Sequence, residues 1–209
     1  MDVNKLIEEL KVVPVVVIDD EKDAVSLAKA LCEGGLPIAE VTFRTKAAKG
    51  SIEKISKEVP EMTVGAGTIL SVDQAKDAID AGAKFIVSPG FDEKVVDYCM
   101  SVNVPVYPGC ITPTEIIKAM SMGLDTVKFF PAEQFGGIAT IKALSAPFTT
   151  MKFMPTGGIS LDNLKDYLAV KSVVACDGSY MVKKDLIASG QFDKIVELTK
   201  KTVEIAKSV

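Results

Sequence analysis

The chain has 209 residues, of which 48% are hydrophobic and 25% are charged, a composition typical of one globular domain with a full apolar core. Its 28 Asp and Glu residues outnumber the 24 Lys and Arg residues, and the resulting formal net charge of −4 disfavours nucleic acid as a partner. The sequence contains no histidine, which excludes Ser-His-Asp and Cys-His nucleophile systems and metal sites that depend on imidazole.

The first ten residues lack the basic start and long apolar run of a signal peptide, and no other stretch reaches the ~20 apolar residues that cross a bilayer. We therefore predict a cytoplasmic protein with no membrane partner. The cysteines are far apart and show no C-x-x-C spacing, so we expect small buried side chains rather than disulfides or a zinc site. They are Cys32, Cys99, Cys110 and Cys176.

Short runs rich in Val, Ile and Phe alternate with segments of helical periodicity that often end in Gly or Pro, which is typical of repeated βα units. In chain order, the predicted strands span Val12–Ile18, Ile38–Phe43, Thr63–Thr68, Phe85–Ser88, Pro105–Tyr107, Thr126–Phe130, Lys152–Pro155 and Ser172–Cys176. The predicted helices between them span Asp23–Glu33, Ala47–Glu58, Val72–Ala81, Glu93–Val102, Pro113–Met122, Ile138–Leu144 and Asp162–Leu168.

Eight parallel strands with intervening helices can close into a (β/α)8 barrel in chains of ~200 residues. An open doubly wound sheet is the alternative, but the turn at Ile18–Lys22 lacks the glycine-rich phosphate-binding pattern of that fold. We therefore predict an α/β protein, a single-domain (β/α)8 TIM barrel over residues 1–209 with an extra N-terminal helix. Helices near Val3–Leu10 and Phe192–Ala206 would cover its two ends.

Lys128 interrupts the sixth predicted strand, with Val127 before it and Phe129 and Phe130 after it. A barrel strand is buried on both faces, so a charge in its apolar run is unfavourable unless that charge has a partner or a function. Burial of a lysine favours the neutral amine, which is the nucleophile of Schiff-base chemistry. Position alone leaves two interpretations open: a catalytic lysine, or a structural ion pair, for instance with Glu40.

The second predicted strand places Glu40, Thr42 and Arg44 on one face, while Val41 and Phe43 lie on the other. Arg44 is the only arginine of the chain, and a guanidinium at a strand end is suited to binding a carboxylate through two hydrogen bonds, although a plain surface arginine would give the same pattern. Glu40 is the candidate proton carrier, or else only the ion-pair partner of the buried lysine.

The loops after the seventh and eighth predicted strands carry the sequences Pro-Thr-Gly-Gly-Ile-Ser (155–160) and Asp-Gly-Ser-Tyr (177–180). Loops at these two places in a barrel commonly hold phosphate through backbone N–H groups, although glycine pairs also form ordinary turns. Asp177 is unfavourable in such a loop because its carboxylate would repel a phosphate.

Five motifs, taken in order, closely resemble those of the 2-keto-3-deoxy-6-phosphogluconate (KDPG) aldolase family, which also covers 4-hydroxy-2-oxoglutarate (KHG) aldolase. The likeness runs from about Val12 to the C-terminus. The motifs are Glu-Val-Thr-Phe-Arg-Thr (40–45), Val-Gly-Ala-Gly-Thr (64–68), Ser-Pro-Gly (88–90), Val-Lys-Phe-Phe-Pro-Ala-Glu (127–133) and Pro-Thr-Gly-Gly-Ile-Ser (155–160).

The resemblance implies a role for each matching residue. Lys128 would form the Schiff base with the keto carbon, and Glu40 would move protons. The pyruvate half would be bound by Arg44 and Thr68, which hold its carboxylate, and by Pro89, Phe130 and Thr156, which line the pocket. The phosphate would be bound by Gly157, Gly158, Gly178 and Ser179.

The resemblance also implies a class I aldolase that needs no cofactor or metal and forms a homotrimer. It would cleave KDPG to pyruvate and glyceraldehyde 3-phosphate, or KHG to pyruvate and glyoxylate. Asp177 departs from the Gly-Gly-Ser that is common in the family, which puts the preference for a phosphorylated substrate in doubt.

Three alternatives remain at this stage. One is a related pyruvate aldolase with another aldehyde, such as an enzyme acting on 2-keto-3-deoxy-6-phosphogalactonate. A second is a phosphosugar isomerase or epimerase that uses Glu40 as a base and Lys128 as an electrostatic clamp. The third is a metabolite-binding barrel without turnover.

Overall fold

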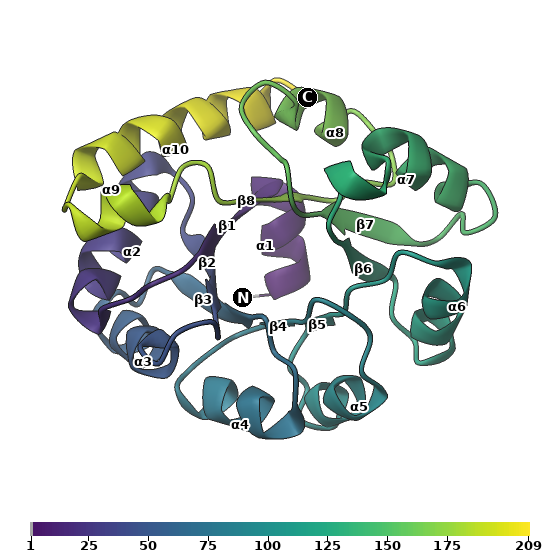
Figure 1. Ribbon diagram of the computed structural model, residues 1–209, viewed down its shortest axis with the longest axis horizontal. Coiled ribbons are helices and arrows are strands. Elements are labelled where there is room, and N and C mark those ends of the chain that lie inside the picture. The colour runs from purple at the N-terminus through teal and green to yellow at the C-terminus, as the bar shows by residue number, and fades with distance from the viewer. Residues whose placement is uncertain (1) are drawn as a thin grey trace.

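The computed structural model describes residues 2–209 and shows eight parallel strands arranged in a ring, with helices around the outside (Figure 1). Seven strands start within a residue of the predicted positions. The strands are β1 (Val12–Val16), β2 (Ile38–Thr42), β3 (Thr63–Gly67), β4 (Ile86–Val87), β5 (Val106–Tyr107), β6 (Thr126–Phe129), β7 (Lys152–Pro155) and β8 (Cys176–Gly178).

The hydrogen-bonded ladders form two sheets, so the predicted eight-stranded barrel is confirmed only in part. Six strands pair in the order β5-β4-β3-β2-β1-β8, and β6 pairs with β7. Between these sheets there are only isolated parallel bridges, at Gly109–Lys128 on one side and at Phe153–Val173 and Thr156–Asp177 on the other. Pro105 and Pro108 flank the two-residue strand β5, and prolines donate no ladder hydrogen bond, which explains why pairing is short there.

The helices between strands match the predicted segments closely. Side-chain N-caps start three of them, at Ser71, Asp92 and Thr112. The crossover helices are α2 (Ala24–Gly34), α3 (Ala48–Glu58), α4 (Val72–Asp80), α5 (Glu93–Ser101), α6 (Pro113–Ser121), α7 (Gly137–Ser145) and α8 (Leu164–Leu168). Sequence reasoning missed the 3-10 turns η1 (Glu21–Asp23) and η2 (Glu133–Phe135) and the short helix α9 (Lys184–Ala188).

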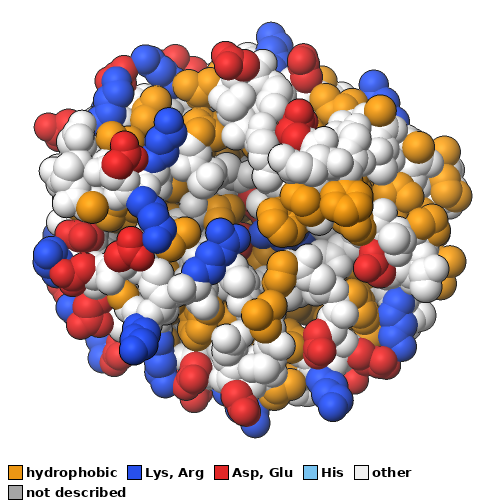
Figure 2. Space-filling view, in the orientation of Figure 1, with side chains coloured by type: hydrophobic (Ala, Val, Ile, Leu, Met, Phe, Trp, Pro, Cys, Tyr) orange, Lys and Arg blue, Asp and Glu red, His pale blue; other side chains and the backbone are white. Residues whose placement is uncertain are grey.

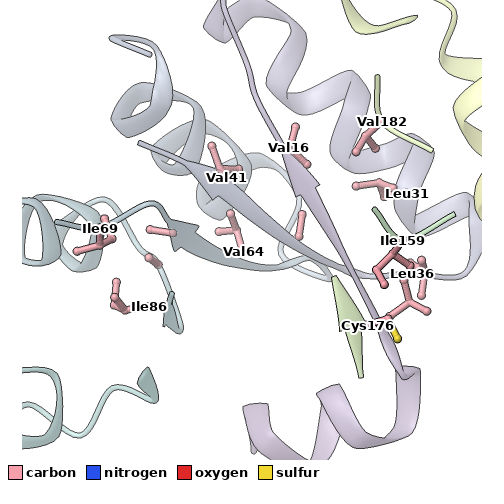
Figure 3. Close-up of a cluster of buried hydrophobic side chains, with 14 of the residues drawn as sticks. Val16, Leu31, Leu36, Val41, Val64, Ile69, Ile86, Ile159, Cys176 and Val182 are labelled. Carbon is pink, nitrogen blue, oxygen red and sulfur yellow. The ribbon is translucent and has the colours of Figure 1, made fainter. Parts of the chain in front are cut away.

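Two apolar clusters fill the molecule. The larger one lies between the strands and the outer helices and includes Val16, Leu31, Val41 and Val64 (Figure 3). The smaller one lies inside the ring, where Phe85 and Tyr107 pack edge to face. Helix α1 (Val3–Leu10) contributes Ile7 to this inner cluster and therefore covers the ring at the end where the strands begin. The opposite end, where the strands finish, stays open for a site.

Two predicted positions are wrong. Helix α10 (Phe192–Lys207) does not cover an end of the ring; it lies on the outside, packed along α2 (Figure 1). Strand β8 starts at Cys176, at the end of the predicted segment Ser172–Cys176. The run before it is apolar and β-branched like a strand, but the ladder with β1 begins only where Cys176 pairs with Val12.

Candidate active site

A buried ion pair crosses the interior of the ring. Nζ of Lys128, on β6, lies 3.4 Å from both carboxylate oxygens of Glu40, on β2. Lys128 is 5% exposed and Glu40 is 1% exposed. The neighbours of Lys128 on its strand, Val127 and Phe129, pack outward into the core, as strand alternation requires. The structure therefore shows the ion pair of the structural interpretation, and this pair is compatible with the catalytic interpretation.

Asp177 is a second carboxylate on this lysine. Its Oδ2 lies 3.5 Å from Nζ of Lys128 and accepts a 2.6 Å hydrogen bond from Oγ1 of Thr156. Asp177 belongs to β8 and is 1% exposed, so the prediction that it lies in the phosphate loop is wrong. The error has the same origin as the displaced strand: β8 extends through Asp177 to Gly178, and strand alternation turns the aspartate into the ring.

Burial raises the pKa of the Asp177 carboxyl from its ordinary value of 3.8 to about 7, because removal from water disfavours the anion. The nearby carboxylate of Glu40 acts in the same direction. The ammonium of Lys128 and the hydroxyl of Thr156 oppose the shift, because both stabilise the ionised form. The site therefore contains a carboxyl group that can change protonation near neutral pH.

Two glycines of β3 make room for side chains inside the ring, and sequence reasoning did not assign them a role. A Cβ on Gly67 would lie 1.8 Å from Oε1 of Glu40, and a Cβ on Gly65 would lie 2.4 Å from the ring of Phe85. A glycine at every second position of a strand weakens the strand, so it indicates that another group approaches closely. The alternating glycines of Val-Gly-Ala-Gly (64–67) are the sequence feature that could have indicated this close approach.

Arg44 and Thr68 lie together at the open end of the ring, as the resemblance implies. Nε of Arg44 donates a 3.1 Å hydrogen bond to Oγ1 of Thr68. Thr68 has φ = 57°, a left-handed conformation that is unfavourable for a β-branched residue and is often found at functional sites. Thr42 instead donates a 3.0 Å hydrogen bond to the carbonyl of Val16, so it joins β2 to β1.

Two further predicted pocket residues lie near the lysine. The ring of Phe130 has its centre 5.8 Å from Nζ of Lys128, which allows a cation–π contact. Pro89 is half-buried, and its carbonyl oxygen would lie 2.2 Å from a Cβ on Gly109. Gly109 in turn bridges to Lys128, so the backbone around Pro89 is packed tightly beside the lysine strand.

A cavity of about 380 Å³ opens at this end of the ring, and Figure 2 shows the hollow near the centre of the face, with basic side chains beside it. The cavity brings together most of the predicted binding residues with several that were not predicted. Its lining includes Arg44, Phe130, Thr156, Gly157, Gly158, Asp177, Ser179, Lys183 and Lys184.

Three of the four residues predicted to bind phosphate line this cavity. Gly157 and Gly158 both have positive φ, at 97° and 82°, a conformation that side chains rarely adopt and that glycine permits. Ser179 is exposed toward the same cavity, whereas Gly178 is buried in β8 and does not line it. The N-terminal segment of α9 adds Lys183 and Lys184 to the lining, and Nζ of Lys184 is paired with the carboxylate of Asp19 at 3.0 Å.

The arrangement combines a buried amine, two carboxylates that can move its protons, an arginine suited to a carboxylate and a basic glycine-rich outer end. Residues 2–209 contain no cluster of three or more His, Cys, Asp or Glu side chains that could hold a metal ion. They also contain no helix long and apolar enough to span a bilayer. The cysteines are unpaired; three are buried and Cys32 is partly exposed.

The model of the family described as KDPG and KHG aldolase matches residues 3–198. The chain belongs to the KDPG and KHG aldolase family. It is 47% identical over 199 residues to the 2-dehydro-3-deoxy-phosphogluconate aldolase of Treponema pallidum, with 95% of each chain covered. The resemblance stated from the motifs is therefore confirmed, as is the assignment of the chain to the aldolases.

Solved structures of KDPG aldolases have the same fold. The Legionella pneumophila enzyme, with pyruvate captured as a covalent carbinolamine, has a TM-score of 0.93 and 35% identity over 97% of this chain and 98% of its own. The Zymomonas mobilis enzyme with 3-phosphoglycerate has a TM-score of 0.90 and 36% identity over 97% of this chain and 95% of its own.

Proposed function

We propose that this chain is a class I aldolase that cleaves KDPG to pyruvate and glyceraldehyde 3-phosphate through a Schiff base on Lys128, and that also cleaves KHG to pyruvate and glyoxylate. The observation that carries the proposal is the buried Lys128–Glu40 pair, which lies behind a cavity lined by Arg44 and by Asp177, the second carboxylate on Lys128. A captured pyruvate adduct in the similar Legionella enzyme supports the same chemistry here.

In the proposed reaction, Arg44 and Thr68 hold the substrate carboxylate, while the amine of Lys128 attacks the keto carbon. The resulting protonated imine withdraws electrons from the bond between carbons 3 and 4. Glu40 takes the proton of the 4-hydroxyl, the bond between carbons 3 and 4 breaks, and the aldehyde leaves. Protonation of the remaining enamine and hydrolysis of the imine release pyruvate and restore the lysine.

The phosphorylated substrate is the better fit for the outer end of the cavity. Gly157, Gly158 and Ser179 are the proposed phosphate ligands, and Lys183 supplies positive charge, while the charge of Lys184 is shared with Asp19. Asp177 also lines the cavity, but it is 1% exposed and its Oδ2 faces Lys128, whose positive charge offsets its own. The relative with 3-phosphoglycerate supports a site for a phosphorylated compound.

Borohydride trapping tests this proposal. Incubation with pyruvate and borohydride should reduce an imine and add mass to the peptide that contains Lys128, with K128M as the control that remains unlabelled. An isomerase or epimerase that uses Lys128 only as a charge would form no such adduct, and a binding protein would show no turnover. Steady-state comparison of KDPG, KHG and 2-keto-3-deoxy-6-phosphogalactonate would then rank the aldolase substrates.

The domain organisation, the closure of the barrel and the oligomeric state are proposals as well. We infer that residues 1–209 form one domain and that β6 and β7 complete an eight-stranded barrel, because isolated bridges connect them to both neighbours. A homotrimer is supported by exposed apolar side chains, Ile117 and Met120 on α6 and Phe135 on η2. Light scattering of the protein and of I117E would test the trimer. The cytoplasmic location and the independence from cofactors and metals stay predictions.

A further inference from the structure

Lys128 contacts two carboxylates, but the proposed cleavage gives a task to only one of them. Glu40 is assigned the 4-hydroxyl proton, whereas Asp177 lies 3.5 Å from the reacting nitrogen with no assigned role. The motif resemblance does not supply a role either, because glycine is common at this position in the family. Neither the proposed cleavage nor the family resemblance therefore assigns a role to Asp177, and its surroundings are the remaining evidence.

The two oxygens of Asp177 differ in their surroundings. Oδ2 faces Lys128 and accepts the hydrogen bond from Thr156. Oδ1 is buried and accepts no hydrogen bond from any of residues 2–209. A buried carboxylate that lacks a partner on one oxygen is unfavourable as an anion, so the group gains by taking up a proton. The hydroxyl of Thr156 is closer but is a much weaker acid, so the proton source is the ammonium of Lys128, 3.5 Å from Oδ2.

We propose that Asp177 accepts the proton that Lys128 must lose before its amine attacks the keto carbon. The proposal rests on the Schiff-base function given above. In this step, an N–H bond of the ammonium breaks and an O–H bond forms on Asp177, which leaves a neutral amine and a neutral carboxylic acid. The two carboxylates then have separate tasks: Asp177 serves imine formation, and Glu40 serves the proton of the 4-hydroxyl.

The atoms and charges balance over the whole step. The amine forms a C–N bond with the keto carbon, and the electron pair of the C=O bond moves to oxygen. That oxygen takes up the nitrogen's second proton and, on leaving, the proton stored on Asp177, so that water departs. The products are a protonated imine, one water molecule and an ionised Asp177, so the aspartate is ready for the next cycle.

The charged surroundings are compatible with this cycle. The titratable groups that act on the pKa of Asp177 are Lys128 on β6 and Glu40 on β2. Asp177 in turn raises the pKa of Cys176 on β8 and of Tyr107 on β5, and the β1 residue paired with it is Val13. Burial and Glu40 together keep the pKa of the Asp177 carboxyl far above its ordinary value, which makes it a better proton acceptor.

The rate of pyruvate trapping tests the proposal, because trapping reports imine formation and not carbon–carbon cleavage. D177N, which keeps the shape of the side chain but cannot accept the proton as a carboxylate does, should lower the trapping rate by ~10-fold or more. E40Q should lower the trapping rate less than D177N and should lower KDPG cleavage strongly. D125N, at an exposed aspartate next to the start of β6, is the matched control and should trap at the rate of the unmodified protein.

The pH profile separates proton transfer from a merely structural role. The trapping rate of the unmodified protein should fall as the pH is lowered and Asp177 becomes protonated, and D177N should lose this dependence. T156V removes a hydrogen bond that stabilises the ionised carboxyl, so its profile should move to higher pH. If D177N does not fold, D177G can replace it in the same trapping experiments, since glycine is common at position 177 in the family.

Two results would overturn the assignment. One is a trapping rate and pH profile of D177N equal to those of the unmodified protein. The other is a T156V profile that does not move. These results differ from failure of the function itself, in which pyruvate would not label Lys128 in the unmodified protein at all.

Discussion

Glu40 and Gly67 compete for one space inside the ring, since a Cβ on Gly67 would lie 1.8 Å from Oε1 of Glu40. The two residues lie on neighbouring strands but are not register partners, because Glu40 of β2 pairs with Gly65 of β3 and Thr42 pairs with Gly67. The missing side chain on β3 is therefore what allows the carboxylate of Glu40 to extend across the ring to Lys128.

G67A should consequently push the carboxylate of Glu40 away from Lys128. We expect loss of aldolase activity together with a destabilisation of roughly 1–3 kcal/mol, the usual range for adding a methyl group to a packed interior. Urea denaturation and KDPG cleavage measure the two effects. G90A is the matched control, because a Cβ on Gly90 would meet nothing within 4 Å. Full activity of G67A would contradict the interpretation.

The local pattern of the sequence predicts much of this fold for a physical reason. Strands such as Val12–Val16 and helices such as Ala48–Glu58 are specified by short-range periodicity and by caps, which lie within the segment itself. Placement of α10 depends on which long-range surface it covers, and that surface is α2. The sequence of Phe192–Lys207 alone does not indicate which element this helix packs against.

The candidate site likewise contains residues that the local sequence predicts and one whose position depends on long-range packing. Lys128, Glu40 and Arg44 could be predicted because each is a charge in or beside an apolar strand, which is unfavourable without a purpose. Asp177 has the same property but was assigned to the phosphate loop, because the apolar residues before it imitate a strand that ends at Cys176, two residues before the observed end at Gly178. Its true environment depends on the register between β8 and β1, which only the folded chain specifies.

E40Q should slow the cleavage of KDPG by ~10²–10⁴-fold while still allowing an imine with pyruvate. The amide cannot take the 4-hydroxyl proton, and the chain has no histidine to replace it. Rapid-quench measurement of pyruvate release gives the cleavage rate, and borohydride labelling of Lys128 verifies the imine. Normal turnover by E40Q would reduce Glu40 to an ion-pair partner.

R44K should weaken binding of the keto-acid half even though it keeps the positive charge. An ammonium cannot offer two parallel hydrogen bonds to a carboxylate, and one such charged bond contributes roughly 1.5–3 kcal/mol. We expect the KM for KDPG and for KHG to rise together by ~10-fold or more, because both substrates carry this carboxylate. Steady-state kinetics would contradict the assignment if both KM values stayed unchanged.

K183M should reduce kcat/KM for KDPG several-fold and leave KHG almost unaffected, because only KDPG carries a phosphate to the outer end of the cavity. The side chain of Lys183 is exposed at that end, where salt screens its charge. The difference between K183M and the unmodified protein should therefore shrink as salt is raised. K94M, at an exposed lysine on α5, is the matched control. An equal loss on both substrates would contradict a role in phosphate recognition.

D177N should change how stability depends on pH. Folding raises the pKa of the Asp177 carboxyl from 3.8 to about 7, so the protonated group is favoured in the folded state. The neutral Asp177 carboxyl therefore contributes stability that is fully present below about pH 3.8. This stability is lost as the pH rises through 7, because a buried anion must then form. The melting temperature of the unmodified protein should therefore fall between pH 5 and pH 8.5 by more than that of D177N. Calorimetry at the two pH values measures the difference, with D125N as the control. Parallel changes in all three proteins would contradict a raised pKa for Asp177.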